Sequence, residues 1–299
     1  TRMTAQFIEV APDIYWLKTY IPGRPTIFSV YAIKGETGIL VEPGPASLIP
    51  AIKEAADAIG INDFQYIIPT HIHLDHAGAV GGLCKLYPDA QIVVNPSSPK
   101  HLIDPTKLIR STKMAFGDDF DAVYGAIVPV PESRIKVVQD GEKLFSGGKE
   151  LTFIHTPGHA SHHMCILENA TGGLFCGEAL GLIYSEGAPP LPAVAPPGFD
   201  EVLYIENMKK LRKLKPKLLL YSHDGIGYEP DTLIRQVIEN SITIGKAILR
   251  ALKAGKSEDA IVVLLGDYIW NHFAVKLDAY DLESNIKGYI FYYKKQGLI

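Results

Sequence analysis

The sequence predicts an α/β fold in which two β-sheets pack face to face, with helices on the outside. Two series of short, apolar, β-prone runs are separated by stretches with helical periodicity, as expected for strands that alternate with helices. The chain has 299 residues, of which 47% are hydrophobic and 21% charged. A chain of this length and composition can bury a sizeable core.

The first series of strands begins with an antiparallel meander. Residues 8–19 and 26–42 alternate apolar and polar side chains around turn signals. Residues 47–59 then show the spacing of an amphipathic helix, and residues 64–70 form a short apolar run that is typical of a buried strand. This run leads directly into a cluster of histidines.

A short strand at residues 91–95 is followed by a long interruption at residues 96–131, which is partly helical at 106–116. Interruptions of this length inside a compact domain are usually functional. One interpretation is a lid or wall over a binding site. The alternative is a helical excursion that only packs on the surface. The lid interpretation offers these side chains to a substrate: Arg110, Lys113, Phe116 and Tyr124.

The second half predicts a second series of strands, followed by helices. The predicted strands are 134–138, 149–155, 164–168, 173–177 and 218–222, with a helix at 203–214. After Pro230 the periodicity is helical, and a further helix is expected at 257–273. We therefore expect a catalytic unit at residues 1–229 and a helical extension at 230–299 that packs on it. A homodimer through these C-terminal helices is a further hypothesis.

The histidines after the strand at 64–70 give the strongest chemical signal. Thr70-His71-Ile72-His73-Leu74-Asp75-His76 places three imidazoles and one carboxylate within six residues. In an extended segment His71 and His73 point to the same side, because side chains alternate with period two. Asp75 and His76 follow in a turn that is expected to open a helix at residues 77–82. Neutral imidazole and carboxylate favour a divalent transition metal such as zinc, iron or manganese.

Other strand ends carry further candidate ligands. His159 follows the Pro-Gly turn after the strand at 149–155, Glu178 follows the strand at 173–177, and His223 follows the strand at 218–222. Rigid turns of this kind often present ligands. Of the neighbouring histidines, His162 is the one most expected to reach a cleft. Glu42, at the end of another buried run, is either a surface acid or a group that orients a metal-bound histidine.

These turns together resemble the metallo-β-lactamase superfamily over about residues 7 to 228. The resemblance rests on His-x-His-x-Asp-His at 71–76, Thr-Pro-Gly-His at 156–159, Phe-x-Gly-acid at 175–178 and Ser-His at 222–223. It implies an αββα sandwich of two mixed sheets with a binuclear metal site at one edge. The resemblance assigns ligands as follows: His71, His73 and His159 for the first metal, Asp75, His76 and His223 for the second, and Glu178 as a bridge between them.

The bridging position departs from the family pattern. The family usually has aspartate where this chain has Glu178, and also where it has Glu42. The additional methylene of Glu178 requires a different rotamer, a shifted backbone or the loss of the bridge. Two divalent ions, with zinc preferred over iron or manganese, are therefore the expected cofactors, and the occupancy of the second site depends on Glu178.

This ligand set predicts a metal-dependent hydrolase of a small-molecule ester, thioester, lactone or related bond. A metal-bound hydroxide is the expected nucleophile, and Asp75 is expected to orient it and to pass its proton to the leaving group. The main alternative is a mononuclear iron oxidoreductase of the persulfide dioxygenase type, and a second alternative is a phosphodiesterase. Flavodiiron members of the superfamily usually have Glu at the position of His73.

Substrate contacts are predicted from fewer signals. Tyr184 is a candidate oxyanion donor, and His162 and Lys113 are further candidates. The proline-rich stretch at 184–199 is expected to form a second wall of the cleft, lined by Leu191 and Val194, although a plain surface connector is the alternative.

Charge and composition limit the partners. The formal net charge is −4 without a block of basic residues, so we expect no nucleic acid partner. There is no apolar run of membrane-spanning length, and residues 1–7 lack the apolar core of a signal peptide. Three scattered cysteines do not form a disulfide framework, so the expected compartment is a reducing cytoplasm.

Overall fold

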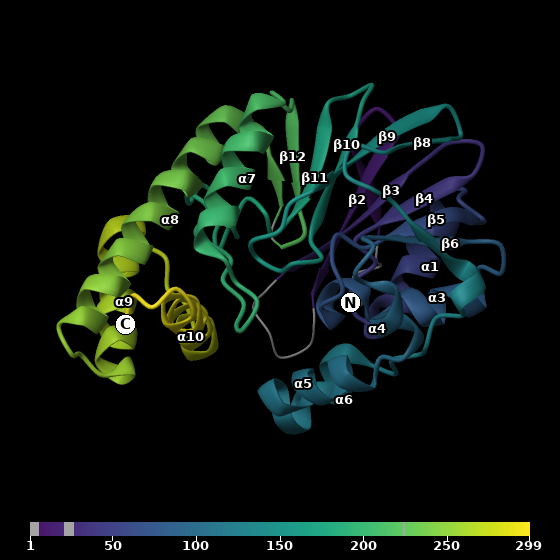
Figure 1. The fold of residues 1–299 in the computed structure, drawn as a ribbon. Coiled ribbons are helices and arrows are strands. Elements are labelled where there is room, and N and C mark those ends of the chain that lie inside the picture. Colours follow the sequence, from purple (N-terminus) through teal and green to yellow (C-terminus); the bar gives the residue numbers. More distant parts are fainter. Residues whose placement is uncertain (1–5, 21–26, 224) are drawn as a thin grey trace, which may run out of the picture.

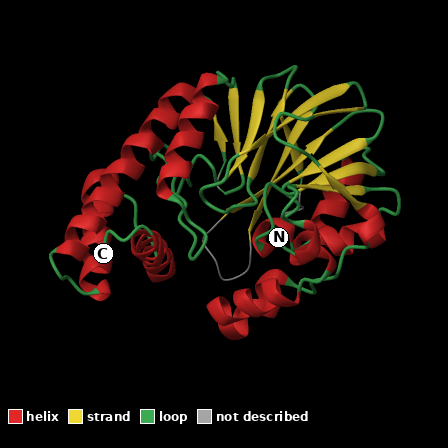
Figure 2. Cartoon of the chain, in the orientation of Figure 1, coloured by secondary structure: helices red, strands yellow, loops and turns green. Residues whose placement is uncertain are grey.

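The computed structural model describes residues 6–20, 27–223 and 225–299. Two sheets form the centre of the molecule, and helices cover both outer faces (Figures 1 and 2). The αββα sandwich expected from the sequence is therefore confirmed. Residues 1–5, part of the segment from which the absence of a signal peptide was inferred, lie outside the described residues, as does the first residue of the predicted 26–42 run.

The first sheet has seven strands in sequence order. The antiparallel meander consists of four strands, because each predicted run contains a turn that divides it: β1 (Phe7–Ala11), β2 (Ile14–Tyr20), β3 (Ile27–Ile33) and β4 (Gly38–Val41). The remaining strands pair in parallel through helical crossovers: β5 (Phe64–Ile68), β6 (Gln91–Val94) and β7 (Ile135–Val137). The sheet is therefore mixed.

The second sheet has six strands in the order β13-β12-β11-β10-β9-β8. Its members are β8 (Lys143–Ser146), β9 (Lys149–His155), β10 (Met164–Glu168), β11 (Gly173–Gly177), β12 (Leu218–Tyr221) and β13 (Ile226–Gly227). Strands β9, β10 and β11 have the predicted bounds. Strands β8 and β13 are not predicted from the sequence, because each is short and contains few consecutive apolar residues.

Helices of the first half cover the outer face of the first sheet. They are η1 (Ala46–Leu48), α1 (Ile49–Ala58), α2 (Leu74–Ala77), α3 (Val80–Leu86) and α4 (Pro99–Ile103). The expected helix after the histidines is thus split, and its first part begins earlier than predicted. Asp75 and His76 belong to the helical turn α2 and not to a preceding loop.

The segment at 96–131 is mostly helical. After α4 it forms α5 (Thr106–Phe116), η2 (Gly117–Asp119) and α6 (Phe120–Tyr124), and η3 (Glu132–Arg134) leads into β7. In Figure 1 helices α5 and α6 lie below the sheets, apart from α1 and α3. The predicted helix at 106–116 is confirmed with the same bounds.

The C-terminal helices pack against the second sheet beside α7 (Glu201–Lys213). They are α8 (Pro230–Lys253), α9 (Glu258–Phe273) and α10 (Ala279–Lys295), of which the sequence analysis did not predict α10 as a helix. Buried residues of all three helices share one apolar cluster with Leu174 and Leu219 of the sheet. None of the helices in the described ranges is long and apolar enough to cross a membrane.

A shared core predicts that the C-terminal helices contribute to global stability. Tyr289 in α10 is fully buried and its ring contacts Phe199 at a centroid distance of 5.1 Å, whereas Phe291 in the same helix is 53% exposed. Tyr289→Ala should lower the free energy of unfolding by about 3–5 kcal/mol. Phe291→Ala, the matched control, should lower it by less than about 1 kcal/mol.

Urea unfolding followed by circular dichroism measures both values. Equal, small losses in the two variants would mean that residues 230–299 do not unfold together with the sheets.

Candidate metal centre

Seven side chains from four separate stretches of the chain converge at one edge of the two sheets. His71 and His73 come from the loop after β5, and Asp75 and His76 come from α2. His159 follows β9, Glu178 follows β11, and His223 follows β12. They form two groups in which one ligand atom from each residue lies within 4.8 Å of the others: His71, His73, His159 and Glu178 in the first, and Asp75, His76 and His223 in the second.

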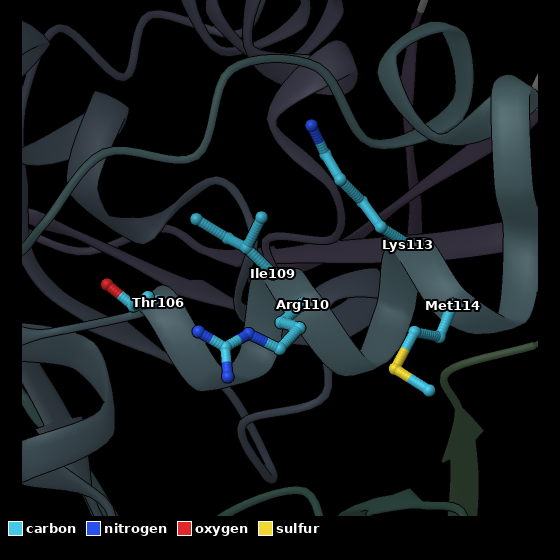
Figure 3. A pocket seen from close by; sticks show the side chains of 5 residues that line it. All are labelled: Thr106, Ile109, Arg110, Lys113 and Met114. Atoms are coloured by element: carbon cyan, nitrogen blue, oxygen red, sulfur yellow. The ribbon is translucent and has the colours of Figure 1, made fainter.

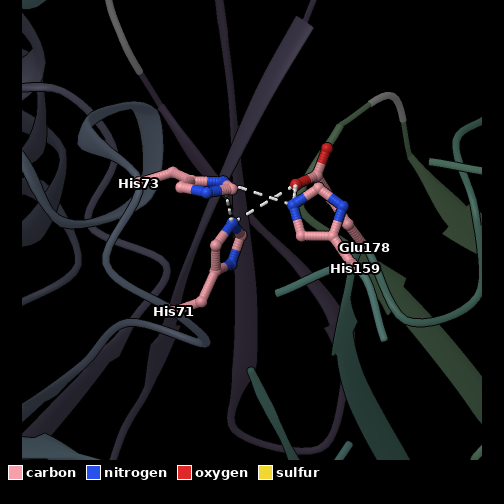
Figure 4. A group of neighbouring side chains, drawn as sticks. All are labelled: His71, His73, His159 and Glu178. Carbon is pink, nitrogen blue, oxygen red and sulfur yellow. Dashed lines mark hydrogen bonds and ion pairs between the residues drawn. The ribbon is translucent and has the colours of Figure 1, made fainter. Parts of the chain in front are cut away.

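The ring nitrogens of the first group point toward one another (Figure 4). His73 Nδ1 lies 3.0 Å from His71 Nε2 and 3.2 Å from His159 Nε2. In a tetrahedral zinc site with Zn–N bonds of 2.0–2.1 Å, neighbouring nitrogens are about 3.3 Å apart. The spacing of these three atoms therefore fits a shared divalent ion.

Contacts on the far side of the rings leave these nitrogens free to bind a metal. His159 Nδ1 lies 3.0 Å from the carbonyl oxygen of Ala193, which accepts hydrogen bonds only, so this nitrogen carries the proton. His71 Nδ1 lies 3.0 Å from the Thr70 hydroxyl. In the neutral form protonated at Nδ1, His159 turns the lone pair of Nε2 toward the centre of the group, and His71 Nε2 faces the same point.

Glu42 holds the second group from behind. Its Oε2 lies 2.6 Å from His76 Nδ1, and its Oε1 accepts a hydrogen bond of 2.6 Å from the Thr70 amide. The carboxylate is 2% exposed. Of the two interpretations of Glu42 left open by the sequence, the structure supports the group that orients a histidine, because both oxygens are used within the site.

Glu178 spans the two groups. Its Oε2 lies 2.7 Å from His159 Nε2, 3.3 Å from His71 Nε2 and 3.4 Å from His76 Nε2, and its Oε1 lies 3.7 Å from His223 Nε2. The longer side chain therefore reaches the position between the groups. Gly177, with φ +53°, supports this placement, because a Cβ there would lie 2.5 Å from His163 Nε2.

Electrostatics in the pocket also suit a bound cation. Burial raises the pKa of Glu178, but the neighbouring His159 and its hydrogen bond outweigh burial and hold the pKa well below its usual value. Burial raises the pKa of Asp75 as well, and His76 and His223 outweigh it in the same way. Burial and the neighbouring His159 lower the pKa of His73 to about 4. The carboxylates are therefore ionised and His73 is neutral, which are the forms that bind metals. Burial lowers the pKa of His76 and of His159, but the nearby carboxylates outweigh burial and raise both pKa values, so a metal that binds there displaces protons from these rings.

The metal centre lies at the bottom of a cleft of about 540 Å³. His73, Asp75, His159, Glu178 and His223 form the floor of this cleft. Its walls come from three segments: α5 with α6, the stretch 182–196, and the first half of α10. The expectations that residues 96–131 and 184–199 contribute walls agree with this lining. Val194 lines the cleft, whereas Leu191 packs into the core.

Of the predicted substrate contacts, some line the cleft and others do not. Tyr184 lines the cleft. Lys113 does not line it: its ammonium lies 3.7 Å from Asp121 and 4.9 Å from the Phe120 ring, beside a shallow hollow on the other side of α5 (Figure 3). The expectation that Lys113 contacts substrate is therefore corrected, because the turn of α5 directs it away.

His162 also differs from the expectation. Its ring stacks on that of His71 at a centroid distance of 6.0 Å, and its Nδ1 accepts a 3.4 Å hydrogen bond from the Ile72 amide, so it packs behind the ligands and not along the cleft wall. His163, ranked below it, is closer to the metal centre: its Nε2 accepts a 3.1 Å hydrogen bond from the Glu178 amide.

Four aromatic residues of the C-terminal helices lie away from the lining of the cleft. Trp270 and Phe291 are exposed, and Tyr292 and Tyr293 belong to the core. The residues of α10 that line the cleft are Tyr280, Asp281, Glu283, Ser284, Asn285 and Lys287. These residues are not predicted from the sequence, because the local pattern of α10 does not indicate that this helix lies next to the metal ligands.

A fold with two packed sheets and a histidine- and carboxylate-rich edge defines a class of metal-binding αββα proteins. Comparison with known proteins assigns the chain to a family of this class. The model of the metallo-beta-lactamase superfamily matches residues 23–223. A metallo-beta-lactamase fold-containing protein of Sulfurisphaera tokodaii is 30% identical over 206 residues, which are 68% of this chain and 74% of that protein. The chain belongs to the metallo-beta-lactamase superfamily.

Other relatives and structures are more distant. A coenzyme F420H(2) oxidase of Methanothermobacter marburgensis is 24% identical over 270 residues, which are 78% of this chain and 60% of that protein. A metallo-beta-lactamase family protein from Thermus thermophilus has the same fold, with a TM-score of 0.72 at 19% identity over 97% of this chain and 95% of that chain. The crystal structure of the Sulfolobus tokodaii protein, which is the relative reported above at 30% identity, superposes with a TM-score of 0.67 at 24% identity, over 94% of this chain and 99% of that chain.

The contacts of Glu42 predict a role in metal affinity. Glu42→Gln replaces one acceptor oxygen by an amide donor, so either the Thr70 amide or the His76 Nδ1–H faces another donor. Metal affinity of the second group should fall by about 10–100-fold. Glu168→Gln, which changes a buried carboxylate at the β10–β11 turn, is the control. Competition with a chromophoric chelator measures the metal affinity of the two variants and of the wild type. An affinity of Glu42→Gln equal to that of the wild type would contradict the role of Glu42.

Proposed function

We propose that the protein is a metal-dependent hydrolase of a small-molecule ester, thioester, lactone or related bond. The observation that carries the proposal is the arrangement of two ligand groups joined by Glu178 at the floor of a cleft that a small molecule can enter. Cavities of 300–1,000 Å³ are typical of small-molecule sites. Members of the superfamily are generally metal-dependent hydrolases.

The chain supplies the ligands and the proton transfer. The histidines, Asp75 and Glu178 would hold two divalent ions, with zinc as the preferred metal. Such ions lower the pKa of water and polarise the bond that is attacked. Water adds to the carbonyl carbon, the bond to the leaving group breaks, and Asp75, which lines the cleft between His76 and His223, accepts the proton and returns it to the leaving group. Tyr184 donates to the developing oxyanion.

The alternative is a mononuclear iron oxidoreductase of the persulfide dioxygenase type. The relative named as an oxidase supports retaining a redox alternative. The second ligand group supports the hydrolase, because Asp75, His76 and His223 each offer one ligand atom and these atoms lie within 4.8 Å of one another, as a second ion requires. A phosphodiesterase remains the second alternative.

Loss of the metal or its ligands should abolish hydrolysis. His73→Ala and Asp75→Ala should each lower kcat/KM for a p-nitrophenyl ester by at least about 10³-fold, because each removes a ligand and Asp75 also transfers the proton. Dialysis against a chelator should inactivate the protein, and zinc should restore it. Hydrolysis that survives in the metal-depleted His73→Ala variant would overturn the proposal.

The position of Glu178 between the two ligand groups predicts how many metal ions each variant binds. Glu178→Gln should reduce the metal content from two ions towards one, because an amide cannot neutralise two cations, whereas Glu178→Asp should retain both ions if the backbone adjusts. Elemental analysis after gel filtration measures the ratio. Two ions per chain in Glu178→Gln would contradict the bridging role, and one iron per wild-type chain, with oxygen uptake on glutathione persulfide, would favour the dioxygenase.

A further inference from the structure

Tyr204 in α7 is buried next to the first ligand group and is 1% exposed. Its hydroxyl donates a 2.8 Å hydrogen bond to the carbonyl oxygen of Glu178 and accepts one of 3.0 Å from the amide of Ala193. Burial raises the pKa of Tyr204 above its usual value, so the phenol stays protonated and can donate. One buried side chain therefore joins the main chains of Glu178 and Ala193.

The two main-chain segments that Tyr204 joins both contact His159. The carbonyl oxygen of Ala193 accepts a 3.0 Å hydrogen bond from His159 Nδ1, and the Glu178 carboxylate lies 2.7 Å from His159 Nε2 (Figure 4). A closed cycle of contacts thus runs through four residues: Tyr204, Glu178, His159 and Ala193. Because the cycle is closed, the phenol constrains how the carboxylate meets the imidazole.

Further hydrogen bonds hold the main chain of Glu178. Its amide donates a 3.1 Å hydrogen bond to His163 Nε2, and its carbonyl oxygen also accepts one of 3.2 Å from the Gly181 amide. Glutamate has one more rotatable bond than aspartate, so its carboxylate reaches a larger volume from a given main-chain position. A fixed main chain therefore matters more at this position than it would with aspartate.

The start of α7 packs directly on the turn that carries His159. The Asp200 amide donates a 2.8 Å hydrogen bond to the carbonyl oxygen of Gly158, and a Cβ at Gly158 would lie 2.5 Å from the Cα of Tyr204. The main chain of α7 is thus fixed to the turn before His159, while the hydroxyl of Tyr204 reaches Glu178. This helix contacts both turns without supplying a ligand of its own.

We propose that Tyr204 is a positioning residue that sets the distance between Glu178 and His159 in the first ligand group. The proposal rests on the metal centre of the proposed function and is independent of the bond that is hydrolysed. Without the hydroxyl, the Glu178 carbonyl and the Ala193 amide lose the group that joins them, and the two ligands vary in position. Ligands that are held in place beforehand bind more tightly, because binding then costs less conformational entropy.

Tyr204→Phe, which keeps the ring and removes the hydroxyl, tests this role. The variant should release metal to a chelator at least about tenfold faster than the wild type, because contacts that orient ligands change metal affinity by about 10–100-fold. It should also shift the visible absorption bands of the cobalt-substituted protein, since these bands depend on the arrangement of the ligands.

Tyr293→Phe is the matched control. Tyr293 is also 1% exposed, and its hydroxyl donates a 2.9 Å hydrogen bond to a main-chain carbonyl, that of Gly245 in α8. Both variants should lower the urea midpoint of unfolding by similar amounts, but Tyr293→Phe should keep the wild-type rate of metal release and the wild-type cobalt spectrum. A Tyr204→Phe protein that matches Tyr293→Phe in both readouts would overturn the proposal.

If Tyr204→Phe does not fold, two analogues that fill the volume of the hydroxyl replace it. 4-Aminophenylalanine in place of Tyr204 can donate to the Glu178 carbonyl, whereas 4-fluorophenylalanine cannot, and both are weak acceptors for the Ala193 amide. The fluoro variant should release metal at least about tenfold faster than the amino variant. Equal rates of release would show that the donated hydrogen bond does not position the ligands.

The metal centre and the role of Tyr204 fail in different ways. A wild-type protein that retains neither zinc nor cobalt after loading would contradict the metal centre. Crystal structures of the metal-free wild type and of Tyr204→Phe then decide the role of Tyr204. A changed distance between Glu178 and His159 in the variant supports that role, and an unchanged distance overturns it.

Discussion

The Glu178 carboxylate, held between histidines of both ligand groups, is the interaction on which the site depends. A buried carboxylate is stable only when opposite charge or hydrogen-bond donors compensate for its lost hydration. The converging imidazole nitrogens likewise need a positive ion between their lone pairs. A cation bound between the groups would therefore stabilise Glu178 and be stabilised by it, and the end of β11 must place this side chain accurately.

Direct contacts between the two sheets provide that accuracy. The Met164 amide of β10 donates to the carbonyl of Thr70, immediately before the first histidines, and the Ser29 amide of β3 donates to the carbonyl of Ser222, immediately before His223. Both hydrogen bonds are 2.8 Å long and join opposite sheets beside the ligands. Ligands that are about 150 positions apart in sequence therefore lie on one rigid frame, which is the arrangement that a preorganised site requires.

The walls of the cleft come from other kinds of elements than its floor. The floor comes from strand ends, whose positions are determined by the sheets. The walls come from α5, α6, α10 and a proline-rich stretch, none of which belongs to either sheet. The superfamily match covers the segments that supply the floor, whereas α10 lies beyond the matched residues 23–223.

The sequence alone was sufficient to predict the sandwich, most strand positions and all seven residues that converge, because strand ends and the His-x-His-x-Asp-His spacing are local signals. It could not predict that Lys113 turns away, that His163 and Tyr204 support Glu178, or that α10 covers the cleft. These features depend on contacts between segments far apart in the chain. Side-chain direction across such contacts is decided by tertiary packing, which local periodicity does not encode.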